Sequence, residues 1–113
     1  MDKFGIRIRE LRQAKGYSLR QLAPLVGVGF SYLSKVERGC LDFDGTASES
    51  LIHKLADVLE GDEDELLLLA HRIPTCIAEQ IFEYPEMFRE LARCNEYQLQ
   101  QIVKTTKKVV GSG

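Results

Sequence analysis

Two short helical patterns joined by a glycine-containing corner constrain the fold of this chain more than any other feature. The first begins at Ser18, where the spacing Ser18-x-x-Gln21 forms a capping box ahead of apolar residues, and it ends at Gly27. The second covers about residues 30–38 and stops at Gly39, since glycine readily takes the left-handed backbone conformation that ends a helix. The sequence therefore predicts two short helices that meet at a tight turn.

The second of these helices has an apolar and a largely polar face. Leu33 and Val36 are three residues apart and are predicted to point inward. Ala23 is small enough for the two helices to cross closely, and Gly27 permits a turn with positive φ. The outward face then holds a mixed set: Phe30, Ser31, Ser34, Lys35 and Arg38. This combination is typical of the DNA-binding helix-turn-helix.

Helical periodicity also dominates the rest of the chain. One pattern precedes the pair, over about residues 3–15, and Gly16 ends it, whereas residues 40–47 are predicted to form a loop. Five further helices are predicted from their caps or first-turn residues: Ser48 (with an end at Gly61), Asp62, Thr75, Pro85 and Asn95. The tail, KKVVGSG, is expected to fray. We therefore expect an all-α fold, with a five-helix domain over residues 1–72 and a C-terminal helical extension over residues 73–113.

Charge is unevenly distributed along the chain. The formal net charge is −2, but residues 1–38 carry eight Lys/Arg against three acids, whereas residues 39–70 carry Lys54 alone against nine acids. A basic segment beside an acidic one suggests a polyanionic partner for the basic segment. An unevenly charged solvated surface fits the charge pattern equally well, so charge alone does not decide.

Nothing in the sequence indicates catalysis or a bound cofactor. The 113 residues suffice for one small domain with an appended arm, but they are few for an enzyme with an enclosed cleft. There is no phosphate-binding loop and no Ser/His/Asp order with a supporting motif. Cys40, Cys76 and Cys94 form no CxxC pair, and we expect neither His53 nor His71 to share a face with a carboxylate or cysteine in a metal-binding arrangement. We expect no enzyme, no metal site and no cofactor.

The same sequence argues against a membrane partner. It contains no run of about eighteen apolar residues that could span a bilayer. Its first residues, MDKFGIRIRE, are too charged for a secretory signal. We therefore expect a cytoplasmic protein.

Several motifs occur in the order, and near the spacing, of one known family. They are IRELRQAKGYSLRQLA, GV, SYLSKVERG, LIHKLADVL and DEDELLLLA. Through them, residues 4–70 resemble the helix-turn-helix domain of the Xre and phage-repressor type of transcription regulators. The segment RIPTCIAEQIFEYPEMFRELA resembles a helical extension that follows this domain in one subgroup. The resemblance implies a repressor-type fold of five helices, the third of which lies in the DNA major groove.

The resemblance also implies contacts between the third helix and DNA bases. Phe30 and Ser31 match the first exposed positions, which usually read base edges, and Ser34 and Lys35 follow one turn later. Phe30 offers only apolar contact, such as to a thymine methyl group, whereas serine hydroxyls donate or accept hydrogen bonds. Lys35 is able to reach a guanine or a phosphate.

Other residues are implied to bind phosphates or to support the fold. Arg20 and Gln21 belong to the first turn of the second helix, where the helix N-terminus also favours an anion. Arg38 is expected to bind a phosphate or to pair with an acid. In the family, the glutamate that matches Glu37 commonly bonds to an arginine of the first helix, and Arg12 is the candidate partner.

Two features depart from the family pattern. Gly29 stands where a serine or threonine usually caps the third helix, so that helix is expected to begin less firmly. The loop after Gly39 is longer than usual, and Asp42 and Asp44 lie where basic side chains often meet the DNA backbone. Because two carboxylates repel phosphate, we expect this loop to swing away from DNA or to face a protein partner.

These features predict a transcription regulator that binds double-stranded DNA, by family habit a dimeric repressor that reads a palindromic operator. The apolar residues of the extension exceed the needs of a five-helix domain, and we expect them to form a homodimer contact: Ile77, Ile81, Phe82, Phe88, Leu91, Leu99 and Ile102. Packing of these residues onto the fifth helix of the same chain is an equally good interpretation. The alternative function is a protein-interaction module or antitoxin that uses the helix-turn-helix as a scaffold.

Overall fold

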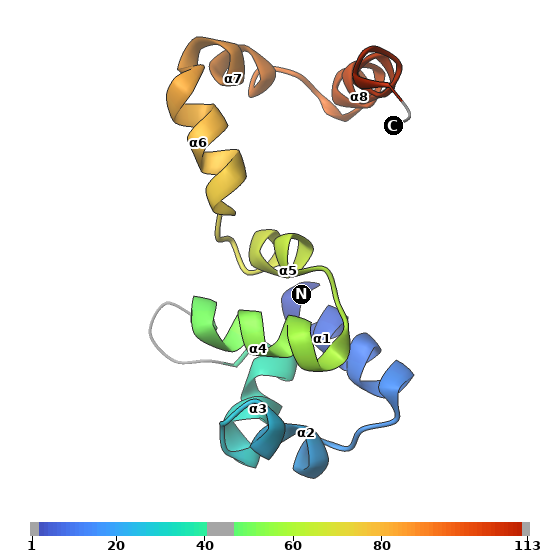
Figure 1. Ribbon diagram of the computed structural model, residues 1–113, viewed down its shortest axis with the longest axis vertical. Helices are drawn as coiled ribbons and strands as arrows, with labels where there is room; N and C mark the ends of the chain where they lie inside the picture. Colours follow the sequence, from blue (N-terminus) through green and yellow to red (C-terminus); the bar gives the residue numbers. More distant parts are fainter. Residues whose placement is uncertain (1–2, 41–46, 112–113) are drawn as a thin grey trace. The chain divides into compact units, whose positions relative to one another are not determined.

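The computed structural model describes residues 3–40 and 47–111 (Figure 1). All regular secondary structure in these residues is helical, which confirms the all-α fold class. The helices of the described chain are α1 (Lys3–Lys15), α2 (Leu19–Leu25), α3 (Phe30–Arg38), α4 (Glu49–Leu59), α5 (Glu63–Leu69), α6 (Thr75–Glu83), α7 (Pro85–Leu91) and α8 (Glu96–Val110). They fall into two compact units, residues 1–74 and residues 75–113. Within the described ranges, every helix is too short or too polar to cross a membrane.

α1 and α3 have the bounds that the sequence predicts, whereas α2 ends at Leu25, short of the predicted end at Gly27. Gly16 and Gly39 follow α1 and α3 with φ angles of 76° and 69°, the left-handed conformation that glycine takes without strain. The predicted capping box is present, because Ser18 Oγ accepts from the N–H of Gln21 and Gln21 Oε1 accepts from the N–H of Ser18. Pro24, which lacks an N–H, lies inside α2, and the helix ends one residue later.

The caps of the later helices also agree with the sequence in most cases. Ser48 and Asp62 cap α4 and α5, each accepting a hydrogen bond from the backbone N–H three residues further on. Asn95 caps α8 in a second capping box, and Pro85 is the first residue of α7. Local hydrogen bonding therefore sets where these helices start.

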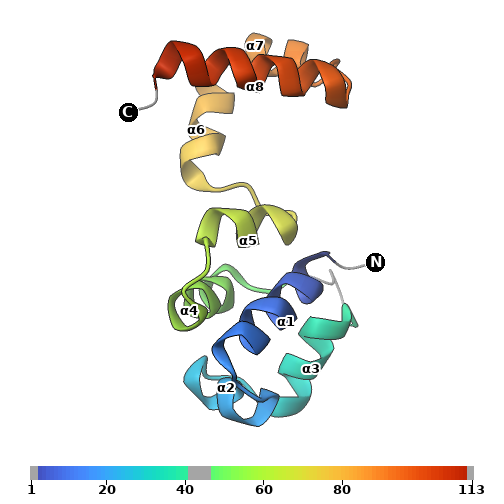
Figure 2. The same ribbon diagram turned by 90° about the vertical axis from the view of Figure 1, so that its right-hand side faces the viewer.

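The five helices from α1 through α5 share one apolar core. α1 contacts α3, α4 and α5, and the two views show it lying beside them (Figures 1 and 2). Leu33 and Val36 are buried, as predicted, so the inner face of α3 is fixed to this core. The largest fully buried side chains come from all five helices and from the residue that ends α2: Ile8, Leu22, Val26, Leu33, Val36, Ile52, Leu55, Leu59 and Leu66. Burying each stabilises the unit by about 1.5–3 kcal/mol, which holds α3 firmly and leaves its other face free.

α1 and α3 pack too closely for any residue but glycine at position 5. A Cβ atom added at Gly5 would lie 2.4 Å from the carbonyl oxygen of Glu37 and 2.7 Å from that of Val36. Both neighbours are backbone atoms of α3, so neither can rotate away. Gly5 therefore determines how closely α1 supports α3.

The end of α4 differs from the prediction. Gly61 was expected to end the helix, but Glu60 is the C-cap residue, with a φ angle of 55°. A Cβ atom on Gly61 would lie 2.9 Å from Leu11 Cδ1, so the glycine serves close packing against α1 instead. The carboxylate of Glu60 pairs with the ammonium group of Lys15 on α1.

The C-terminal unit departs from the prediction in two places. Thr75 is the first residue of α6 rather than the residue that caps it. The tail does not fray at KKVV, because α8 continues to Val110 with Lys107 and Lys108 in its last turn, where positive charge suits the helix dipole. None of residues 75–111 is buried.

Candidate nucleic-acid interface

The corner between α2 and α3 is closed by backbone contacts. Gly27 has a φ angle of 73°, which confirms the predicted turn with positive φ. The N–H of Val28 donates to the carbonyl oxygen of Ala23 at 3.1 Å, and Ala23 is buried where the helices meet. α2 and α3 therefore lie side by side, as both views show (Figures 1 and 2), and form a helix-turn-helix.

The side of α3 that faces away from the core contains the residues singled out in the sequence. Phe30, Ser31, Lys35 and Arg38 are exposed, and Ser34 is half-buried. The Nε of Arg38 donates to the backbone carbonyl of Ser34 at 3.3 Å, which holds the arginine against its own helix. This surface of α3 combines hydroxyl groups, two cations and one aromatic ring.

α2 adds two exposed polar side chains next to this surface. The guanidinium carbon of Arg20 lies 4.5 Å from the centroid of the Phe30 ring, a cation–π contact between the two helices. The side-chain oxygen of Gln21 is already used in the capping box, so only its amide NH₂ group is left to donate to a ligand. Both residues lie in the first turn of α2, whose backbone N–H groups favour an anion.

The basic residues of the first 38 positions divide into two groups. Within α1, four pair with acids: Arg7 with Glu10 and Glu65, Arg9 and Arg12 with Glu37, and Lys15 with Glu60. The other four form no ion pair with any residue in 3–40 or 47–111: Lys3, Arg20, Lys35 and Arg38. Three of these lie on α2 and α3, so the positive charge available to a ligand is concentrated on the helix-turn-helix.

Glu37 anchors the C-terminal end of α3 to α1, as the resemblance implies. Its side chain is 1% exposed and accepts hydrogen bonds from Arg12, whose side chain is 12% exposed. The Nη1 of Arg12 also donates to the backbone carbonyl of Tyr17 at 2.9 Å, in the segment that leads to α2. The hydrogen bond to Glu37 raises the pKa of Arg12 above its usual value. One guanidinium thus connects α1, the start of the helix-turn-helix and α3.

Sequence reasoning missed one exposed side chain on α3. Tyr32 is 39% exposed, the same fraction as Phe30, and it follows Ser31 directly. Its only signal in the sequence was its place between Ser31 and the inward-pointing Leu33. Asp42 and Asp44, the acids of the loop after α3, lie outside the described residues.

Residues 3–40 and 47–111 contain no cluster of three His, Cys, Asp or Glu side chains arranged to hold a metal ion. A shallow hollow at the end of α4 is lined partly by acids, and His53 and Glu63 are hydrogen-bonded across it at 2.6 Å. This hollow lies on α4 and α5 and includes no residue of α2 or α3.

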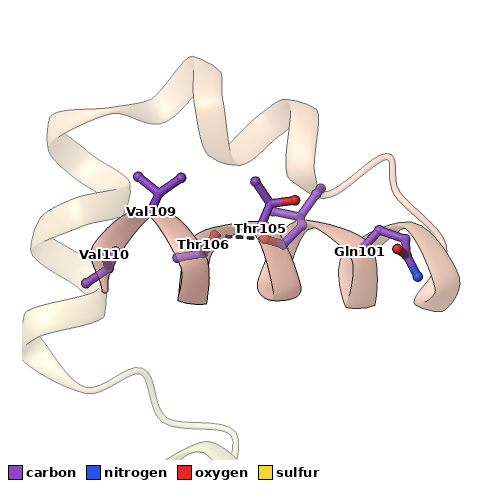
Figure 3. A pocket seen from close by; sticks show the side chains of 6 residues that line it. Gln101, Thr105, Thr106, Val109 and Val110 are labelled. Atoms are coloured by element: carbon purple, nitrogen blue, oxygen red, sulfur yellow. Dashed lines mark hydrogen bonds between the residues drawn. The ribbon is translucent and has the colours of Figure 1, made fainter. Parts of the chain in front are cut away.

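A second surface of interest is the exposed apolar face of α8. A shallow hollow follows this helix and is lined by Gln101, Ile102, Thr105, Thr106, Val109 and Val110, whose side chains Figure 3 draws as sticks, all but Ile102 with a label. Thr106 Oγ1 donates to the carbonyl oxygen of Ile102 at 2.8 Å, so its hydroxyl is satisfied within the helix and its methyl group is left to the surface. Val109 and Val110 are 79% and 77% exposed. The face is therefore open to a partner.

The other apolar residues of the extension differ in how far they are exposed. Ile77, Ile81, Phe88 and Leu91 are half-buried within their unit. Phe82 is 80% exposed, and Leu99 and Ile102 are partly exposed. Of the residues expected at a homodimer contact, those on α8 and Phe82 are the most accessible.

Known proteins resemble this geometry and this sequence. A family model described as a helix-turn-helix domain matches residues 3–69. RghRB of Bacillus subtilis, an uncharacterized HTH-type transcriptional regulator, is 34% identical over 90 residues, which are 80% of this chain and 57% of RghRB. The HTH-type transcriptional regulator SinR of Bacillus subtilis is 40% identical over 63 residues, or 56% of this chain and 54% of SinR. The chain thus spans about half the length of these relatives.

Solved structures agree. The restriction-modification controller protein C.AhdI from Aeromonas hydrophila has 46% identity and a TM-score of 0.51, over 57% of this chain and 92% of that one. SinR in complex with DNA has 39% identity and a TM-score of 0.50, over 57% of this chain and 97% of the SinR chain. A chain of the SinR/SinI complex has 27% identity and a TM-score of 0.52, over 92% of this chain and 94% of that one. With the helix-turn-helix geometry and a family model that covers more than half of its residues, this chain belongs to the helix-turn-helix family of the Xre and phage-repressor type.

Proposed function

We propose that this chain is a sequence-specific transcription regulator that binds double-stranded DNA through α2 and α3. The observation that carries the proposal is the distribution of free charge. Arg20, Lys35 and Arg38 are exposed on the helix-turn-helix without an acidic partner in the described ranges, whereas most basic side chains of α1 are consumed by ion pairs. Unpaired cations on one face are the electrostatic footprint of a phosphate-binding surface.

Within this proposal the residues have different roles. Phe30 and Ser31, at the start of α3, read base edges in the major groove, with Ser34 and Lys35 one turn later. Arg20, Gln21 and Arg38 bind phosphates and set the register of the helix on the duplex. The crystal structure of SinR in complex with DNA, 39% identical over 57% of this chain, supports a duplex as the ligand.

We further propose that the regulator is a homodimer joined through the exposed face of α8, and that it acts as a repressor. One recognition helix contacts only a few base pairs, so two helices related by symmetry discriminate operators far better than one. The accessible apolar side chains of α8, among them Ile102, Val109 and Val110, support a contact of this kind. Exposed apolar side chains grouped on one helix face are typical of a protein contact.

A protein-interaction role is the second candidate. The SinR/SinI complex, in which SinR is joined to another protein, matches 92% of this chain, so the match extends beyond the helix-turn-helix into the extension. In this alternative, the α8 face binds a different protein and the helix-turn-helix serves as a scaffold. Asp42 and Asp44 remain candidates for such a contact.

The test of DNA binding is a selection from a random duplex library, followed by affinity measurements over a range of salt concentrations. We expect an enriched sequence whose dissociation constant rises steeply with salt, because bound phosphates release counterions. The double variant Ser31→Ala/Lys35→Ala should lose about 10- to 100-fold in affinity. The comparison variant is Ser50→Ala/Lys54→Ala, which removes the same groups at the same spacing from α4, where Lys54 lies near the Gly27 corner and not on the outward side of α3.

The absence of an enriched duplex would contradict the DNA-binding proposal and favour the scaffold alternative, whereas equal losses in both double variants would contradict the placement of Ser31 and Lys35 at the DNA surface. The dimer is tested separately by analytical ultracentrifugation of Ile102→Gln/Val109→Gln. Lys104→Gln/Lys107→Gln is its control, because the helical repeat puts these lysines on the opposite side of α8. Only the first variant is expected to dissociate, and a dimer that survives in both would remove α8 from the interface.

A further inference from the structure

The contact between Arg20 and Phe30 links two residues that the proposed function treats separately. Phe30 is the first residue of α3 and is 39% exposed, so its ring faces solvent at the tip of the recognition helix. The guanidinium carbon of Arg20 lies 4.5 Å from the centroid of that ring. At this distance the planar cation lies within cation–π range of the ring. The two side chains thus form one surface unit across the corner.

The contact matters because the start of α3 is otherwise weakly fixed. Gly29, the residue before Phe30, provides no side-chain hydrogen bond to the first turn. An exposed phenylalanine at such a position samples several rotamers, which would cost entropy on binding. Contact with the guanidinium restricts the ring before any ligand arrives. Arg20 is therefore placed where it would act on Phe30 as a positioning residue.

The contact leaves Arg20 able to bind a ligand as well. No acid in the described ranges pairs with its guanidinium, and none of its N–H groups is used in a hydrogen bond to a described residue. A guanidinium is able to stack through its face while it donates through its edge, which a lysine ammonium cannot do. The charge of Arg20 is thus available to bind a ligand while the plane of its guanidinium contacts the Phe30 ring.

We propose that Arg20 and Phe30 act as a single unit that makes the regulator prefer a thymine methyl group at one position of each half-site. The ring of Phe30 is the apolar surface that contacts the C5-methyl group, which distinguishes thymine in the major groove. The plane of Arg20 holds the ring in that position, and its charge binds the neighbouring phosphate. This inference rests on the proposed DNA-binding function and adds to it one specified base feature and one positioning residue.

The test uses the full chain and a duplex enriched from a random library, in which each thymidine in turn is replaced by deoxyuridine. This replacement removes only the methyl group and leaves the hydrogen-bonding edge unchanged. We expect one position per half-site where uracil weakens binding about three- to fivefold, the effect of one methyl group withdrawn from an apolar contact. Phe30→Ala should reduce the ratio of the two dissociation constants at that position to about one.

Arg20→Lys separates the two consequences of the arginine. Because lysine keeps the charge but lacks the plane, we expect the salt dependence of binding to stay unchanged while the thymine-to-uracil ratio falls toward one. Arg38→Lys is the matched control, since Arg38 is an exposed arginine of α3 that contacts no aromatic ring in the described ranges. The ratio should be the same in this variant as in the wild-type chain.

Each other outcome overturns a definite part of the proposal. If the wild-type chain enriches a duplex but tolerates uracil at every position, the thymine preference is wrong and the regulator function stands. If the ratio of the dissociation constants for the uracil and thymine duplexes falls to one in Phe30→Ala but keeps its wild-type value in Arg20→Lys, the positioning role of Arg20 is wrong. If the wild-type chain enriches no duplex, this inference and the proposed function fail together.

Discussion

The guanidinium of Arg12 holds the buried carboxylate of Glu37 by two hydrogen bonds. The distances are 2.6 Å from Nε to Oε2 and 3.0 Å from Nη2 to Oε1. Arg9 adds one longer contact, 3.4 Å from its Nε to Oε1, and its own side chain is half exposed. Glu37 lies at the C-terminal end of α3, so this pair fixes the angle at which the recognition helix leaves the core.

Arg12→Met should destabilise the fold by about 3 kcal/mol, because a buried carboxylate would keep only the weaker contact with Arg9. Arg9→Met is the matched control and should cost less than about 1 kcal/mol, since Arg9 is half solvated and makes a single long hydrogen bond. Urea unfolding followed by circular dichroism measures both. Equal effects from the two variants would show that the carboxylate depends on Arg12 no more than on Arg9.

Gly5→Ala should lower the free energy of unfolding by about 1–3 kcal/mol, because its Cβ would lie 2.4 Å from the backbone oxygen of Glu37. The expected change in stability is opposite to the usual effect of this substitution in a helix. Glycine to alanine inside a helix normally stabilises by up to about 1 kcal/mol through helix propensity. A variant at least as stable as the wild-type chain in thermal unfolding would contradict the close approach of α1 and α3.

Gly29→Ser should stabilise α3 by a few tenths of a kcal/mol, about 0.3, because a hydroxyl would accept from the unsatisfied N–H groups of the first turn. The site permits the change, since φ of Gly29 is −76° and no atom lies within 4 Å of an added Cβ. Ser18→Gly removes the corresponding cap from α2 and should have the opposite sign. Chemical unfolding of both variants checks the pair, and shifts in the same direction would disagree with this account.

The ion pair between Lys15 and Glu60 should make a small contribution to stability that depends on pH. A hydrogen bond from Lys15 holds the pKa of Glu60 below its ordinary value. A lowered pKa means that the stabilisation is present above the unfolded pKa, about 4.3, and is lost as pH falls through the folded value. In Lys15→Met, the pKa of Glu60 measured by carbon-detected NMR titration should return toward the ordinary value. An unchanged pKa would mean that the pair does not persist in solution.

Much of the fold was predictable because its signals are local. Glycines at positions 16 and 39, the capping box at Ser18 and the inward spacing of Leu33 and Val36 act over four residues or fewer. Where local rules compete, the prediction was wrong. Gly61 suggested a helix end, but Glu60 takes the left-handed conformation, and Gly61 instead lies close to Leu11 of α1.

What the sequence determined on its own is the set of helices and the mixed polar face of α3, since both follow from periodicity and capping within single segments. The partnership of Arg12 and Glu37 was anticipated only through the family resemblance. Tertiary structure alone decided which cations stay free and that Arg20 contacts Phe30, ten positions away. Such contacts depend on the distance and angle between packed helices, which a one-dimensional pattern does not contain. The available charge of α2 and α3 is therefore a property of the packed unit.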